Sequence, residues 1–84
     1  MTSYHFTVVV KDSPELTDEL ADRLFSSGCD DATPGMYDGV TVIDFHRRAT
    51  SLERAIRSAV AHVNAAGCVA ERVEINAESL VAAS

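Results

Sequence analysis

Two histidines and an aspartate have the types and spacing best suited to chemistry in this sequence: His5, Asp44 and His46. Asp44 and His46 stand two residues apart, which places both on one face of a β-strand. Two imidazoles and a carboxylate can ligate a transition metal or transfer protons. The same residues also suit the polar face of a sheet that only meets solvent, so both interpretations stay open.

Other catalytic or cofactor signatures are missing from the sequence. It contains no GxSxG, HExxH or EF-hand pattern. The turn KDSPE, which follows the first strand-like segment, lacks the glycines that let backbone amides surround a phosphate group. We therefore expect no bound cofactor.

Four arginines gather near the expected start of the second helix and could bind an anion or nucleic acid: Arg47, Arg48, Arg54 and Arg57. A solvated helix face explains them better, since the formal net charge of -6 and the pI of about 4.8 oppose capture of a polyanion. His62, farther along this helix, is expected to be solvated as well. We expect no direct nucleic-acid binding by this domain.

The two cysteines, Cys29 and Cys68, stand outside any CxxC or CxxH spacing. They are expected to begin the second and fourth strands, at opposite ends of the sheet. A strand of about six residues spans ~20 Å, whereas a disulfide needs Cα atoms within ~7 Å. We therefore expect free thiols, which suits a reducing compartment.

Three segments have the composition and alternation of β-strands: residues 4–11, 40–47 and 68–75. Residues 29–37 suit an edge strand, because Pro34 has no N–H to donate to a ladder. Asp38-Gly39 predicts a two-residue hairpin turn that joins this strand to the next one.

Apolar residues at helical spacing predict two helices. The first follows Ser13, which fits an N-cap, with Thr17 as a rival cap, and it ends at Gly28. The second follows a capping box that begins at Thr50, and it ends at Gly67.

This order of elements predicts an α+β fold, a ferredoxin-like βαββαβ two-layer sandwich with antiparallel sheet order 4-1-3-2. Residues 1–76 form the single domain, and residues 77–84 a short helical or disordered tail. Both helices cover one face, so His5, Asp44 and His46 cluster on the open face, the side of the sheet away from the helices. The expected core contains Phe6, Val8, Leu20, Leu24, Ile43, Phe45, Ile56 and Val60.

Length and composition are those of an ordinary globular chain: 84 residues, 46% hydrophobic and 24% charged. No apolar run approaches the ~20 residues of a membrane span, and the N-terminus lacks a signal-peptide pattern. We therefore expect a cytoplasmic protein. Charge is uneven, with two basic and nine acidic side chains in residues 1–44, and five and four in residues 45–84.

Three phrases resemble the N-terminal βαββαβ domain of a family of small bacterial helix-turn-helix regulators, of the antitoxin-like kind. They are GCDDA at 28–32, DGV at 38–40 and Asp44-Phe45. The resemblance extends over nearly the whole chain and implies the fold and an accessory role in regulation. It does not imply DNA binding, because no residue here matches a recognition helix.

The function that we expect is a non-enzymatic protein-interaction and dimerisation module of a small regulator. One alternative is a small-molecule or metal sensor of the ACT-like type, although such sensors usually have a glycine in the first strand–helix turn. The other is a small enzyme that uses His5, Asp44 and His46. An enzyme of this size would have to complete its pocket by dimerising.

Self-association is expected through the fourth strand or through the open face. The second strand, with Pro34 and Gly35, is a protected edge, whereas the fourth strand has neither residue type. Arg72 and Glu74 could pair reciprocally across a two-fold axis. The expected interaction residues are Val9, Val42, Glu71, Arg72, Val73 and Glu74.

Overall fold

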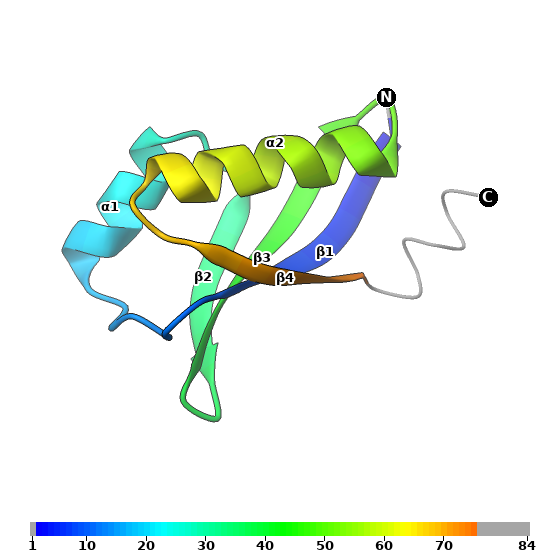
Figure 1. The fold of residues 1–84 in the computed structure, drawn as a ribbon. Helices are drawn as coiled ribbons and strands as arrows, with labels where there is room; N and C mark the ends of the chain where they lie inside the picture. The colour runs from blue at the N-terminus through cyan, green and yellow to red at the C-terminus, as the bar shows by residue number, and fades with distance from the viewer. Residues whose placement is uncertain (1, 76–84) are drawn as a thin grey trace.

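The computed structural model describes residues 2–75, which form an α+β fold of four strands and two helices (Figure 1). The elements are β1 (Thr2–Val10), α1 (Asp18–Ser26), β2 (Ala32–Tyr37), β3 (Val40–Ala49), α2 (Leu52–Ala65) and β4 (Ala70–Ile75). The tail expected over residues 77–84 lies outside the described residues. Within residues 2–75, neither helix is long and apolar enough to cross a membrane.

The four strands form one antiparallel sheet in the order β2-β3-β1-β4. Counted from the β4 edge, this is the same order of neighbours as the expected 4-1-3-2. The two central strands, β1 and β3, are paired so that His5 lies opposite His46 and Thr7 lies opposite Asp44. This register brings together residues that are about 40 positions apart in the sequence.

The core lies between the helices and one face of the sheet. Alternation along β1 and β3 turns Phe6 and Phe45 towards the helices, where their stacked rings lie 5.4 Å apart between centroids. Six of the expected core residues are buried there: Phe6, Val8, Leu20, Leu24, Ile43 and Phe45.

Two expected core residues of α2 lie at the margin of its buried face rather than at the centre. Ile56 and Val60 are only half-buried. Ala55, Ala59 and Val63 are fully buried instead. Small side chains at these positions let the helix approach the large aromatic rings of the sheet closely, so tight packing decides which stripe of the helix faces inward.

The structure selects the rival candidate Thr17 as the N-cap of α1, and it moves the N-cap of α2 from Thr50 to Ser51. Thr17 caps α1, its hydroxyl accepting from the Leu20 amide at 3.1 Å, whereas Ser13 lies in a turn at positive φ. Ser51 caps α2 in place of Thr50, because β3 continues as far as Ala49 and the helix begins one residue later.

Cys29 and Cys68 do not begin strands, since β2 begins at Ala32 and β4 at Ala70. Both cysteines are free and buried in connections that follow the helices. Burial raises the pKa of each thiol, because the thiolate would lose its hydration in the core.

Candidate functional site

The structure brings His5, Asp44 and His46 together on the open face of the two central strands. The distance from His5 Nε2 to Asp44 Oδ1 is 2.8 Å. The rings of His5 and His46 stack with centroids 4.2 Å apart and an angle of 15° between their planes. One potential ligand atom from each of the three residues lies within 4.8 Å of the other two. The sequence placed these residues on one face, and the β1–β3 register puts them in contact.

Thr7 belongs to this group and was not anticipated. Its hydroxyl donates to Asp44 Oδ1 at 2.9 Å, because Thr7 and Asp44 are register partners on β1 and β3. The sequence did carry a signal, since Thr7 follows His5 by two residues and therefore shares its face. An ionised carboxylate can only accept, so His5 Nε2 and the Thr7 hydroxyl are both donors to Asp44.

A hollow of about 310 Å³ opens beside this group on the same face. Its lining consists of His5, Thr7, Tyr37, Val42, Asp44 and Glu74. Tyr37 is the second residue that sequence reasoning missed, and its ring lies against Gly35, where no side chain blocks it. The lining therefore combines two carboxylates, an imidazole and a hydroxyl with one valine side chain and one tyrosine phenol.

Val9 and Val42 are not the exposed apolar surface that the sequence suggested. Their exposed fractions are only 2% and 8%. Arg72 lies opposite Val9 in the sheet register, and Tyr37 covers the Gly35 position opposite Val42. The prediction that burial of these valines drives dimerisation is therefore wrong, since neither has much surface left to bury.

The other expected interaction residues lie on the edge strand β4. Arg72 and Glu74 are on the open face, as their register partners Val9 and Thr7 require. Arg72 already pairs within the chain, at 3.2 Å with Glu71 and 3.4 Å with Glu74. These half-exposed ion pairs compete with any reciprocal pairing across a dimer and contribute little free energy.

Val73 has a different environment from its charged neighbours on β4. It faces the helices and packs, partly buried, against the core. The side chain is thus a structural contact of the single chain, and only the backbone of this residue is available to an edge partner.

Arg47 is buried rather than part of a surface patch, with an exposed fraction of 7%. It donates to both carboxylate oxygens of Asp31 at 2.8 Å and to the Gly28 carbonyl at 2.7 Å. Nη1 donates to Ser58 and to His62 Nδ1, each at 3.1 Å. His62 is therefore half-buried and bonded, and the expectation that it is solvated was wrong.

The ion pair between Arg47 and Asp31 shifts the pKa of both groups. The hydrogen bond from Arg47 lowers the pKa of the Asp31 carboxyl, since it stabilises the ionised form, and the same bond raises the pKa of Arg47. The Arg47 guanidinium also lies 4.9 Å from the centre of the Phe45 ring. Arg47 thus joins β3, α2 and the α1–β2 connection, which is a structural role.

The three remaining arginines of the expected patch line a hollow of about 790 Å³ at the start of α2: Arg48, Arg54 and Arg57. Arg57 forms an exposed ion pair with Glu53 at 2.8 Å, which offsets part of the positive charge. Within the described residues, every buried side-chain nitrogen or oxygen atom already has a hydrogen-bond partner, so none is left unpaired to bind an anion in this hollow. A solvated helix face remains the simpler interpretation.

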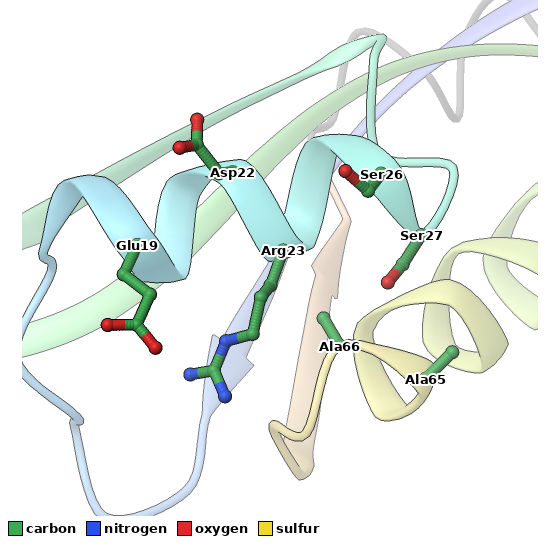
Figure 2. Close-up of a pocket in the computed structure, with 7 residues that line it drawn as sticks. All are labelled: Glu19, Asp22, Arg23, Ser26, Ser27, Ala65 and Ala66. Carbon is green, nitrogen blue, oxygen red and sulfur yellow. The ribbon is translucent and has the colours of Figure 1, made fainter.

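A further hollow of about 490 Å³ lies between α1 and the end of α2 (Figure 2). Glu19, Asp22 and Arg23 contribute charges of both signs, and Ser26 and Ser27 contribute hydroxyls. Figure 2 shows Glu19 and Arg23 extending from the same side of α1, whereas Asp22 points away from them. No histidine or cysteine lines this hollow, so it offers solvated polar groups rather than a reactive centre.

Among residues 2–75 the open face therefore carries the only group of three side chains placed closely enough to share an ion, and β4 is the edge strand without proline or glycine. The regulator family suggested by residues 28–32 and 38–40 stays a hypothesis. Comparisons of the chain with protein-family models, with curated proteins and with solved structures found no match.

Proposed function

We propose that this chain is a non-enzymatic interaction module of ferredoxin-like architecture that forms a homodimer through β4. The βαββαβ order, the antiparallel sheet and the packing of both helices on one face support the architecture. An accessory role beside a regulator, and the recruitment of a protein partner, belong to the same proposal. The two free, buried thiols favour a reducing, cytoplasmic setting for it.

The dimer is supported best by the contrast between the two edge strands of the sheet. Among residues 2–75, β4 pairs on one side only, with β1, and its six residues include neither proline nor glycine. The other edge strand, β2, contains Pro34 and Gly35. Backbone groups from Arg72 to Ile75, beyond the register shift between Ala70 and Arg72, can therefore form a ladder with a second copy, whereas Pro34 interrupts one on β2.

Exposed apolar side chains on β4 and just before it strengthen this choice. Ile75 has an exposed fraction of 41%, and Val69, next to the start of the strand, is more exposed still. A two-fold axis across β4 would bring the beginning of one strand beside the end of the other. Val69 of one copy would then cover Ile75 of the next, and this burial would replace the contribution once expected from Val9 and Val42.

An enzymatic role has weaker support from the open face. The Thr7 hydroxyl donates to the Asp44 carboxylate, which also accepts from His5, so Thr7 lacks the histidine partner that activates a typical hydroxyl nucleophile. The hollow beside it is open to solvent, which leaves a bound substrate mostly in water.

Analytical ultracentrifugation of matched edge variants tests the dimer. We expect the unmodified chain to sediment as a dimer at high micromolar concentration and Ile75→Lys to sediment as a monomer, because a charged side chain on the edge opposes pairing. Met36→Lys is the control, since Met36 is 47% exposed on the opposite edge strand. A monomeric unmodified chain, or a dimer that only Met36→Lys dissociates, would refute pairing through β4.

A further inference from the structure

We propose that His5, Asp44 and His46 form a binding site for one divalent transition-metal ion, with Zn²⁺ as the representative ion. The site lies within one chain, so it does not depend on the dimer proposed above. It goes beyond an interaction module, because it would make the open face responsive to a metal ion.

The ligand types select the class of ion. Two imidazole nitrogens and one carboxylate oxygen suit Zn²⁺, Ni²⁺, Cu²⁺ or Fe²⁺, whereas Mg²⁺ and Ca²⁺ prefer oxygen ligands alone. Asp44, together with Glu74 across the hollow, places negative charge at the site. Arg72 is the cation that faces Glu74, and their ion pair at 3.4 Å neutralises part of that negative charge.

Only a small rearrangement separates the present distances from those of a metal site, since the longer ones must shorten and the His5–Asp44 distance must lengthen slightly. Two ligand atoms that each lie about 2.1 Å from a tetrahedral zinc ion are separated by about 3.4 Å. One candidate ligand atom from each residue lies within 4.8 Å of the other two, and His5 Nε2 lies 2.8 Å from Asp44 Oδ1. His46 is exposed, so rotation of its side chain can close the remaining gap without moving the backbone.

The strands hold the backbones of two ligands side by side. His5 and His46 are direct register partners on the central strands; their rings now stack, so at least one ring must turn out of the stack before both imidazole nitrogens face one ion. Behind them the Phe6 and Phe45 rings are fully buried and fix the same pair of strands. Ligands on rigid central strands lose little conformational freedom when an ion binds.

Thr7 acts as the supporting contact of the carboxylate. The hydrogen bonds that Asp44 accepts from His5 and Thr7 both end on Oδ1, which leaves Oδ2 for the ion. Carboxylate ligands are commonly oriented by such second contacts. Ligation through His5 Nε2 requires that the proton now shared with Asp44 pass to Nδ1 or to solvent.

Three protein ligands leave at least one coordination position open towards the hollow. The open position faces solvent beside Tyr37 and Glu74, so water or a small anionic ligand can complete the coordination. An ion held in this way exchanges readily. The geometry points to reversible metal sensing rather than to a closed structural zinc site.

Isothermal titration calorimetry on the tag-free chain, with ZnCl₂ as titrant and MgCl₂ as the comparison ion, tests this site. We expect one Zn²⁺ per chain and no heat from Mg²⁺. His46→Ala and Asp44→Asn should abolish Zn²⁺ binding, and Thr7→Val should weaken it by about tenfold as a lost supporting contact. Asp38→Asn is the control, because it removes a carboxylate from the hairpin turn and should bind as the unmodified chain does.

Electron paramagnetic resonance of the Cu²⁺-loaded chain supplies a second readout. We expect hyperfine splitting from two imidazole nitrogens, reduced to one in His46→Ala. The titration is run well below the unfolding temperature, because the buried thiols of Cys29 and Cys68 could take up metal once the chain unfolds. Absence of binding at millimolar Zn²⁺, or equal binding by all the variants, would overturn the site.

Discussion

Arg47 and Asp31 form a two-point ion pair that joins β3 to the connection between α1 and β2. Nε donates to Oδ2 and Nη2 donates to Oδ1, both at 2.8 Å. The two parallel bonds match the planar guanidinium to the planar carboxylate. The Arg47 side chain is 8% exposed and that of Asp31 30%, so the pair is partly shielded from water.

Removal of Asp31 should therefore destabilise the fold strongly. Asp31→Ala leaves the buried Arg47 cation without its counter-charge, and we expect a loss of about 3 kcal/mol in the free energy of unfolding. Asp30→Ala is the matched control, because its side chain is exposed and no hydrogen bond or ion pair of Asp30 is found among the described residues. It should cost less than about 0.5 kcal/mol. Urea denaturation measures both values, and equal losses would contradict a structural role for the pair.

The same pair predicts how stability depends on pH. Since Arg47 lowers the pKa of Asp31 in the folded state, the unfolded chain takes up the Asp31 proton first as pH falls below the ordinary value of 3.8. The contribution of Asp31 is therefore fully present above that value and is lost as pH falls through the lower pKa of the folded state.

The check is urea denaturation of the unmodified chain and of Asp31→Ala at a series of pH values from neutral to about 2. The difference between their unfolding free energies should shrink as pH falls below 3.8. A difference that stays constant over this range would show that the charge of Asp31 does not stabilise the fold.

Gly28 and Gly39 should differ in their tolerance of alanine although both have positive φ. Gly28 ends α1 with φ of 108°, and a Cβ there would lie 2.7 Å from His62 Nδ1. Gly39 has φ of 77° in the hairpin turn, with nothing within 4 Å of an added Cβ. Gly39→Ala should lower the free energy of unfolding by about 1–2 kcal/mol, through backbone strain alone. Gly28→Ala should also displace His62 and weaken its hydrogen bond with Arg47.

Thermal unfolding of the two variants gives the comparison. We expect a clearly larger fall in melting temperature for Gly28→Ala than for Gly39→Ala. Similar falls in melting temperature would mean that His62 moves aside without loss of stability and that its hydrogen bond to Arg47 adds little to the free energy of unfolding.

Periodicity alone placed the candidate metal ligands on one face. The alternation of Phe6 and Val8 on one strand, and of Ile43 and Phe45 on another, identifies the face that the helices cover. The opposite parity then assigns His5, Asp44 and His46 to the open face, and the order of elements makes their strands neighbours. These inferences need only the two-residue period of a strand and the chirality of crossovers, which are properties of the chain itself.

The tertiary structure alone decided which side chains are buried and what they contact. Arg47 has the same parity as Phe45, yet its burial depends on Asp31 from one connection and on His62 from α2, segments that no local pattern links. Val9 is buried although its parity places it on the open face, and its register partners, Val42 and Arg72, come from two other strands. Periodicity reports the direction of a side chain, whereas its burial and its partners follow from the close packing of segments distant in sequence.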